Sequence, residues 1–84
     1  DLVEAACLGA NAVINLVAVM GRGMETVNHE GAANVARAAA KAGASALVHV
    51  SAIGADADGK AEYARSKGRG ETAVREAFPK ATII

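Results

Sequence analysis

The sequence is poor in the residues that mark several specialised classes of protein. Its single cysteine, Cys7, excludes an internal disulfide framework and leaves no cysteine cluster for a structural zinc ion. Nine basic residues balance nine acidic ones, so the chain has no net charge to attract nucleic acid or an anionic membrane. No apolar run approaches the roughly 20 residues of a membrane-spanning helix. These absences favour a soluble globular protein, and the cysteine usage suits a reducing, intracellular setting.

The residues that are present predict a core built from small side chains. Hydrophobic residues make up 52% of the 84 positions and aromatic residues only 2%, while 22 positions are alanine. Alanine on a helix face allows the helix to pack closely against a sheet. The chain opens on Asp1 rather than methionine and stops as an apolar run begins at Ile83, so we expect it to be a piece of a longer protein.

Hydrophobic patterning predicts alternating strands and helices. Two short apolar runs rich in β-branched residues are typical of parallel strands that are covered on both faces. Two longer stretches have apolar residues at helical spacing, the first along Val27, Gly31, Val35, Ala38, Ala39 and Ala42. Gly9, Gly43 and Pro79 are expected to end helices. The predicted order is a helix end at 1–8, a strand at 12–19, a helix at 24–42, a strand at 46–52, a helix at 61–78 and a strand at 81–84.

This β-α-β-α-β order with short connections predicts an α/β fold. Parallel strands need crossover connections, which are right-handed in nearly all proteins. We therefore expect a fragment of an α/β, doubly wound parallel sheet with three parallel strands and crossover helices. Ligands of such sheets bind beyond the carboxyl ends of the strands, so the informative residues should follow the two complete strands.

Three polar side chains are expected to meet at that edge. Ser51 ends the second strand, and Tyr63 and Lys67 lie four residues apart on the following helix, so they share a face. A tyrosine has an ordinary pKa near ~10, and a neighbouring ammonium group lowers it by favouring the phenolate. The same ammonium could hold a ribose hydroxyl while the serine polarises a carbonyl. This chemistry suits proton transfer coupled to hydride transfer from a nicotinamide, although a lysine four residues after a tyrosine also occurs on ordinary exposed helix faces.

Other polar residues are weaker candidates. Asn28, early in the preceding helix, could bond backbone and orient a water near the lysine, or could be an ordinary surface residue. We expect His49 to donate to a buried backbone partner and Asn15 to be a satisfied core amide. Glu71 could pair with Lys67 but is expected to be solvated rather than catalytic.

Some features have structural explanations or fail as motifs. Gly68 and Gly70 each cost about 1 kcal/mol relative to alanine in a helix, which close packing would explain. The Gly21-Arg22-Gly23 turn lacks the third glycine of a dinucleotide fingerprint, since Thr26 stands there. The stretch 56–59 only imitates the start of a calcium loop, and no metal site is predicted.

Taken together, these residues resemble the extended and atypical short-chain dehydrogenase/reductase superfamily, which includes NAD-dependent epimerases and dehydratases and NmrA-like proteins. The likeness is greatest to the NAD(P)H-binding accessory subunit of respiratory complex I and its bacterial relatives. It covers essentially the whole chain. The segments that carry it are 27–39, 47–56, Tyr63-Ala64-Arg65-Ser66-Lys67 and 71–84.

The resemblance implies specific roles and a domain. Catalytic positions would be Tyr63, Lys67, Ser51 and Asn28, and cofactor contacts would come from Leu16, Val17, Ala18, Ser51, Tyr63 and Lys67. Residues 1–84 would be the central to C-terminal part of one NAD(P)-binding Rossmann domain, truncated at both ends. The glycine-rich phosphate loop would then lie upstream. The cofactor would be NADP or NAD, with NADP(H) favoured by the resemblance.

Three functions remain open on this basis. The first is a nucleotide-binding protein of the complex I accessory type, partnered by complex I subunits, without nucleic acid and without direct membrane insertion. The second is an active NAD(P)-dependent reductase, epimerase or dehydratase with a Ser-Tyr-Lys site. The third is an NmrA-like redox-sensing regulator. The expected location is the bacterial cytoplasm or the periphery of the inner membrane, and the matrix side of the mitochondrion in a eukaryote.

Overall fold

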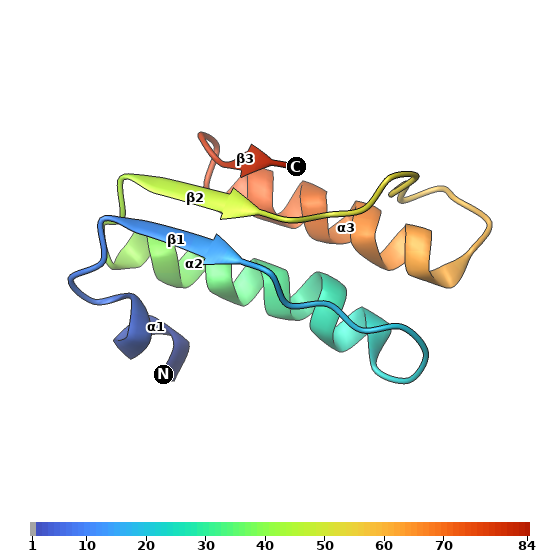
Figure 1. The fold of residues 1–84 in the computed structure, drawn as a ribbon, viewed down its shortest axis with the longest axis horizontal. Helices are drawn as coiled ribbons and strands as arrows, with labels where there is room; N and C mark the ends of the chain where they lie inside the picture. The colour runs from blue at the N-terminus through green and yellow to red at the C-terminus, as the bar shows by residue number, and fades with distance from the viewer. Residues whose placement is uncertain (1) are drawn as a thin grey trace.

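A computed structural model describes residues 2–84, so Asp1 of the first predicted helix lies outside the described residues. The chain alternates helices and strands as the sequence predicts (Figure 1). Gly9 and Gly43 both follow helix ends with a φ of +79°, which confirms their predicted role as terminators. The elements are α1 (Leu2–Cys7), β1 (Ala12–Asn15), a π-helix η1 (Glu25–Gly31), α2 (Ala32–Lys41), β2 (Ala46–His49), α3 (Glu62–Ala77) and β3 (Thr82–Ile83).

The three strands form one parallel sheet in the order β1-β2-β3. Ala12 pairs with Ala46 and Asn15 with His49, while Val48 pairs with Thr82. The predicted α/β, Rossmann-like fragment with three parallel strands is therefore confirmed. Each strand is shorter than the apolar run that predicts it, and the chain at 16–19 and 50–52 continues beyond β1 and β2 without regular secondary structure.

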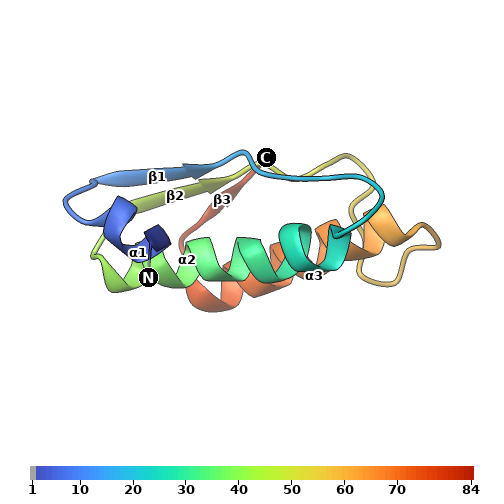
Figure 2. The ribbon, with the colours of Figure 1, turned by 90° about the horizontal axis from the view of Figure 1, so that it is seen from below.

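Helices η1, α2 and α3 all lie on one face of the sheet (Figure 2). Both crossovers step the same way across the sheet, so a common handedness places their helices on the same side. No element among residues 2–84 lies over the other face of the sheet, so the predicted cover of the first strand on that face stays a prediction. Ile14, which points to that face, is 64% exposed.

The core lies between the sheet and the two long helices. Leu47 and Val74 are almost completely buried, and alanines from α2 fill the space between them. The small side chains allow the close helix-to-sheet approach that the composition predicts. The buried cluster comprises Ala32, Ala36, Ala39, Ala44, Leu47, Val74 and Phe78.

The helix predicted over 24–42 is two helices in continuation. The first seven residues, Glu25–Gly31, form a π-helix, and α2 begins directly after it. The buried line lies one residue after the predicted stripe in this part of the helix, so Asn28, Ala32 and Ala36 are buried, whereas Val27, Gly31 and Val35 are only partly buried. No helix among residues 2–84 has the length and hydrophobicity needed to cross a bilayer.

Candidate functional site

Lys67 is the most deeply buried cation at the carboxyl edge of the sheet. It lies in the second turn of α3, is 1% exposed, and donates from Nζ to the Val50 carbonyl at 3.0 Å. Burial lowers the pKa of this ammonium group, and the negative charge of Glu71 opposes that change. The side chain thus ties α3 to the first residue beyond β2.

Tyr63 lies one turn before Lys67 and is partly exposed. The two residues share a helix face, as the spacing predicts. Within residues 2–84, however, no hydrogen bond joins Ser51, Tyr63 and Lys67 to one another, because Lys67 bonds Val50 and Ser51 bonds Glu71. The structure brings Lys67 to the chain beside Ser51 without linking the three polar groups.

Glu71 holds Ser51, which the sequence did not predict. Ser51 Oγ donates to Glu71 Oε2 at 2.6 Å, and the Glu71 side chain is only 19% exposed. Arg75 approaches the other carboxylate oxygen at 3.5 Å. The expectation that Glu71 is solvated is therefore wrong. Its place one turn after Lys67 on a helix that follows a serine-ended strand is the sequence signal that could have identified it.

Asn28 is fully buried and has several hydrogen bonds. Its Oδ1 accepts from the Val19 amide at 2.9 Å, and its Nδ2 donates to the Val19 carbonyl at 2.8 Å and to Ser66 Oγ at 3.1 Å. Ser66 in turn donates to the Tyr63 carbonyl at 3.0 Å. The predicted bonding of Asn28 to backbone is confirmed, and the side chain reaches Ser66 rather than Lys67.

Asn15 and His49 form a polar pair across the sheet. They are in register, and Asn15 Nδ2 lies 3.1 Å from His49 Nδ1, while Asn15 Oδ1 accepts from the Val17 amide at 3.2 Å. Asn15 is thus the satisfied core amide that the sequence predicts. The expectation that His49 donates to backbone is wrong, because its ring bonds a side chain and its Nε2 is buried without a hydrogen-bond partner among residues 2–84. Burial and the nearby charge of Lys67 lower the pKa of His49, which favours the neutral ring.

The segment after β1 is fixed at two points. The Asn15 side chain holds the amide of Val17, and the Asn28 side chain holds both backbone groups of Val19. In this segment the side chains of Leu16 and Val17 are 70% and 62% exposed. This segment therefore presents an ordered backbone and apolar side chains beside the carboxyl edge of the sheet.

The glycines of α3 mark close backbone contacts. A Cβ on Gly70 would lie 2.2 Å from the Asn28 carbonyl oxygen, and a Cβ on Gly68 would lie 2.2 Å from the Ala57 nitrogen. Close backbone packing thus explains why glycine occupies both positions within the helix. These contacts place η1 and the 54–60 loop directly against the helix that carries Tyr63 and Lys67.

Glu25 joins η1 to α3 through an ion pair. Arg69 Nε lies 3.1 and 3.0 Å from the two Glu25 carboxylate oxygens, and His29 Nδ1 also bonds this carboxylate. The hydrogen bond from Arg69, and then that from His29, lowers the pKa of Glu25 from 4.5 to about 2. This pair braces the π-helix on the side of α3 away from Lys67.

The acid dependence of stability should report this ion pair. Because the pKa of Glu25 is lower in the folded protein, its contribution is fully present above about pH 4.5 and is lost as the pH falls towards 2. We expect Glu25→Gln to flatten the pH dependence of the unfolding free energy between these limits in the intact protein. Glu30→Gln, an exposed position on the same helix, is the control and should leave the slope unchanged. An unchanged slope in Glu25→Gln would contradict the pairing.

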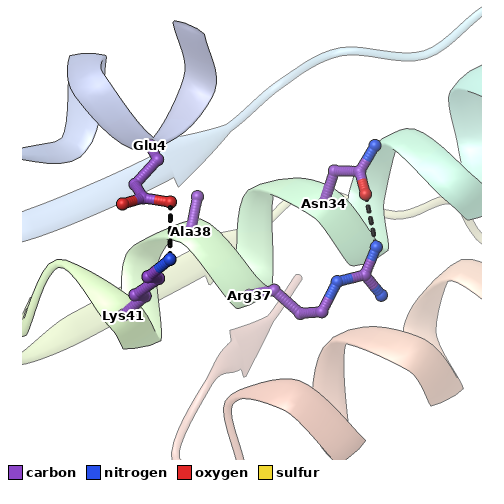
Figure 3. A pocket seen from close by; sticks show the side chains of 5 residues that line it. All are labelled: Glu4, Asn34, Arg37, Ala38 and Lys41. Atoms are coloured by element: carbon purple, nitrogen blue, oxygen red, sulfur yellow. Dashed lines mark hydrogen bonds and ion pairs between the residues drawn. The ribbon is translucent and has the colours of Figure 1, made fainter. Parts of the chain in front are cut away.

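Two surface pockets lie away from Ser51, Tyr63 and Lys67. One is lined by Glu4, Asn34, Arg37, Ala38 and Lys41 (Figure 3), and its cations already pair, Lys41 with Glu4 at 3.3 Å and Arg37 with Asn34. A hollow of about 340 Å³ adjoins Asn15 and Val17 but includes none of Ser51, Tyr63 and Lys67. Among residues 2–84, no group of three or more acidic, histidine or cysteine side chains could hold a metal ion.

A parallel sheet followed by a helix that carries Tyr63 and Lys67 is the arrangement that the resemblance to the extended short-chain dehydrogenase/reductase superfamily implies. The chain is similar to the 40 kDa subunit of mitochondrial NADH-ubiquinone oxidoreductase from Neurospora crassa, with 42% identity over 60 residues, or 71% of this chain. It is 38% and 37% identical, over 91 aligned positions that take in the whole chain, to the mitochondrial NADH dehydrogenase [ubiquinone] 1 alpha subcomplex subunit 9 of rat and mouse. The predicted resemblance to this complex I subunit family is thereby confirmed.

The chain spans only a part of these relatives, 16% of the fungal subunit and 23% of the mammalian ones. No family model matches the sequence. None of the three relatives is named as an epimerase, a dehydratase or a regulator. The similarity therefore favours the complex I type over the two alternatives considered from sequence.

Proposed function

We propose that this chain contributes the nicotinamide side of an NAD(P)-binding site in a protein of the complex I accessory-subunit type. The observation that carries the proposal is the buried Lys67 ammonium at the carboxyl edge of a parallel sheet, one turn from Tyr63. Three relatives named as subunits of NADH-ubiquinone oxidoreductase or NADH dehydrogenase support it. We favour NADP(H) over NAD because of the family resemblance.

The side chains present fit a nucleotide ribose. An ammonium group has three donors, and the structure gives one of Lys67's to Val50, which leaves donors for ribose hydroxyls. The partly exposed Tyr63 would bond the same sugar. The anchored backbone of Leu16, Val17 and Ala18 would lie along the ribose, with apolar side chains against the nicotinamide. A bound nicotinamide would supply hydride-transfer chemistry.

We also propose that residues 1–84 are the central to C-terminal part of one larger Rossmann domain. Parallel sheets are normally covered on both faces, and Ile14 on the uncovered face is 64% exposed. Further chain over that face would bury it and would supply the phosphate-binding half of the site. The fraction of the relatives that this chain spans agrees with such an arrangement.

The proposed partners are subunits of respiratory complex I. The protein would lie in the bacterial cytoplasm at the periphery of the inner membrane or, in a eukaryote, on the matrix side of the mitochondrial one. The named relatives are mitochondrial proteins, which supports the second location. Co-purification with complex I subunits from the native source tests this assignment, and their absence from the purified material would contradict it.

Nucleotide content tests the binding function directly. We expect the intact protein to retain close to one equivalent of NADPH or NADH after dialysis, measured by mass spectrometry of the denatured sample. Lys67→Met should weaken NADPH binding by about 10-fold or more, since a hydrogen bond to a charged group is worth about 1.5–3 kcal/mol. Lys80→Met, an exposed control, should bind normally. Unchanged affinity in Lys67→Met would overturn the proposed site.

Tyr63→Phe separates binding from catalysis. An active reductase would need the Tyr63 hydroxyl for proton transfer and would lose turnover in this variant. The accessory role requires no such step, so we expect nucleotide retention and co-purification with complex I subunits to persist. Turnover of a carbonyl substrate that is lost in Tyr63→Phe would instead establish an enzyme.

A further inference from the structure

The carboxylate of Glu71 contacts the functional edge at a point that neither the family resemblance nor the proposed function assigns. It accepts a hydrogen bond from the Ser51 hydroxyl, with 2.6 Å between the two oxygens, and lies one helical turn after Lys67. Lys67 Nζ binds the carbonyl of Val50, the residue before Ser51. Two side chains on one face of α3 therefore hold two consecutive residues beyond β2.

The backbone around Ser51 is fixed as well. The Val50 amide donates to the Asn15 carbonyl at 3.0 Å, and the Ser51 amide donates to the Ile84 carbonyl at 2.9 Å. Because its hydroxyl hydrogen is engaged in the hydrogen bond to Glu71, Ser51 can offer only its oxygen lone pairs to another group. It can therefore accept a hydrogen bond from a ligand hydroxyl or amide but cannot donate one to a carbonyl.

We infer that Glu71 is a positioning residue that orients the Ser51 hydroxyl as an acceptor and keeps a negative charge beside Lys67. The inference rests on the proposed function in naming the ligand class, a nucleotide that offers hydrogen-bond donors at this edge. The role of Glu71 itself requires no ligand. It also explains why a carboxylate is kept 19% exposed beside a buried ammonium group.

The charges that face Lys67 favour this assignment. From β2, His49 lies close enough to be affected by Lys67, and burial favours its neutral form. From α3, Glu71 is the neighbour that raises the pKa of Lys67 against the effect of burial, and Tyr63 lies on the same face. From η1, Glu25 is engaged by Arg69 and His29, and Glu30 is exposed. Glu71, whose own ion pair is with Arg75, is thus the acidic side chain among the described residues whose charge acts on Lys67.

The first test needs no nucleotide. The titration of Lys67 is followed by NMR in the intact protein with carbon-13-labelled lysine, for the wild type and for Glu71→Gln. The glutamine keeps the shape and an acceptor oxygen but removes the charge, so we expect the Lys67 midpoint to move to lower pH. Glu76→Gln, an exposed position on the same helix, should leave the midpoint unchanged. A purely structural role for Glu71 would also leave it unchanged, and that result would overturn the inference.

A second variant keeps the test decisive if Glu71→Gln fails to fold. Ser51→Ala removes the bond that holds the carboxylate in place, and the midpoint of Lys67 should then also move to lower pH. An unchanged midpoint in this variant would contradict the positioning role.

NADPH is the probe for the coupled effect on binding. Because Glu71 acts through Ser51, the losses of NADPH affinity in Glu71→Gln and Ser51→Ala should not add in the double variant. If the wild type binds no NADPH, the proposed function fails while the Lys67 titration still decides the role of Glu71. If the wild type binds NADPH and the two losses add fully, the inference fails and the proposed function stands.

Discussion

Gly70→Ala should destabilise the intact protein by about 3 kcal/mol, the upper part of the range for overpacked interiors. Alanine normally gains about 1 kcal/mol over glycine within a helix, so the expected change has the opposite sign. The reason is the Asn28 carbonyl oxygen, which would lie 2.2 Å from the new Cβ. Backbone on both sides leaves no flexible side chain to move aside, so η1 and α3 would have to separate.

Gly31→Ala is the matched control for this substitution. Gly31 has ordinary helical dihedral angles, so alanine fits its backbone conformation. The added Cβ would meet only the Thr26 carbonyl oxygen, at 3.4 Å. We expect the stability of this variant to remain within about 1 kcal/mol of the wild type. Urea unfolding followed by circular dichroism provides the measurement. Equal stabilities of the two variants would show that η1 and α3 do not touch at Gly70.

Asn28→Ala should cost about 3 kcal/mol of unfolding free energy. The substitution removes three hydrogen bonds from a fully buried site and leaves the amide and carbonyl of Val19 without their partner. Loss of this anchor should also release the segment after β1. Faster amide hydrogen exchange at Val17 and Val19 in the variant would report that release.

Asn34→Ala serves as the comparison, because Asn34 is an exposed asparagine on the neighbouring helix whose side chain, within residues 2–84, bonds only Arg37. Its substitution should change stability by no more than about 0.5 kcal/mol. Should Asn28→Ala prove equally mild, the side chain would not be holding Val19 in solution.

Local patterning predicts much of this fold because the signals involved are local. Gly43 ends a helix through its own conformational freedom, and β-branched apolar runs identify parallel strands without knowledge of their neighbours. The prediction fails where contacts with other elements determine the end of a strand or helix. The apolar run from Ala12 to Val19 looks uniform, yet β1 ends at Asn15, which pairs with His49, the last residue of β2. Beyond this point the Asn15 side chain accepts a hydrogen bond from the Val17 amide.

The candidate site was predictable as a set of residues and unpredictable as a network. The spacing of Tyr63 and Lys67 fixes their shared face, and the end of β2 places Ser51 nearby. The pairing of the polar groups depends on the strand register and on the depth at which α3 packs. His49 and Asn15 are 34 residues apart in the sequence, and Ser51 and Glu71 are 20 residues apart. Neither the register nor the packing depth is encoded in a short stretch of sequence.

The two asparagines that hold the chain beyond β1 have a thermodynamic consequence for recognition. Ordering a flexible residue costs about 1–2 kcal/mol of conformational entropy, which a loose loop would lose when a ligand arrives. Here the backbone between Asn15 and Val19 loses that entropy during folding, because Asn15 and Asn28 fix it beforehand. A ligand that docks along Leu16 and Val17 therefore contacts a backbone that is already ordered, and more of its contact energy remains available as affinity.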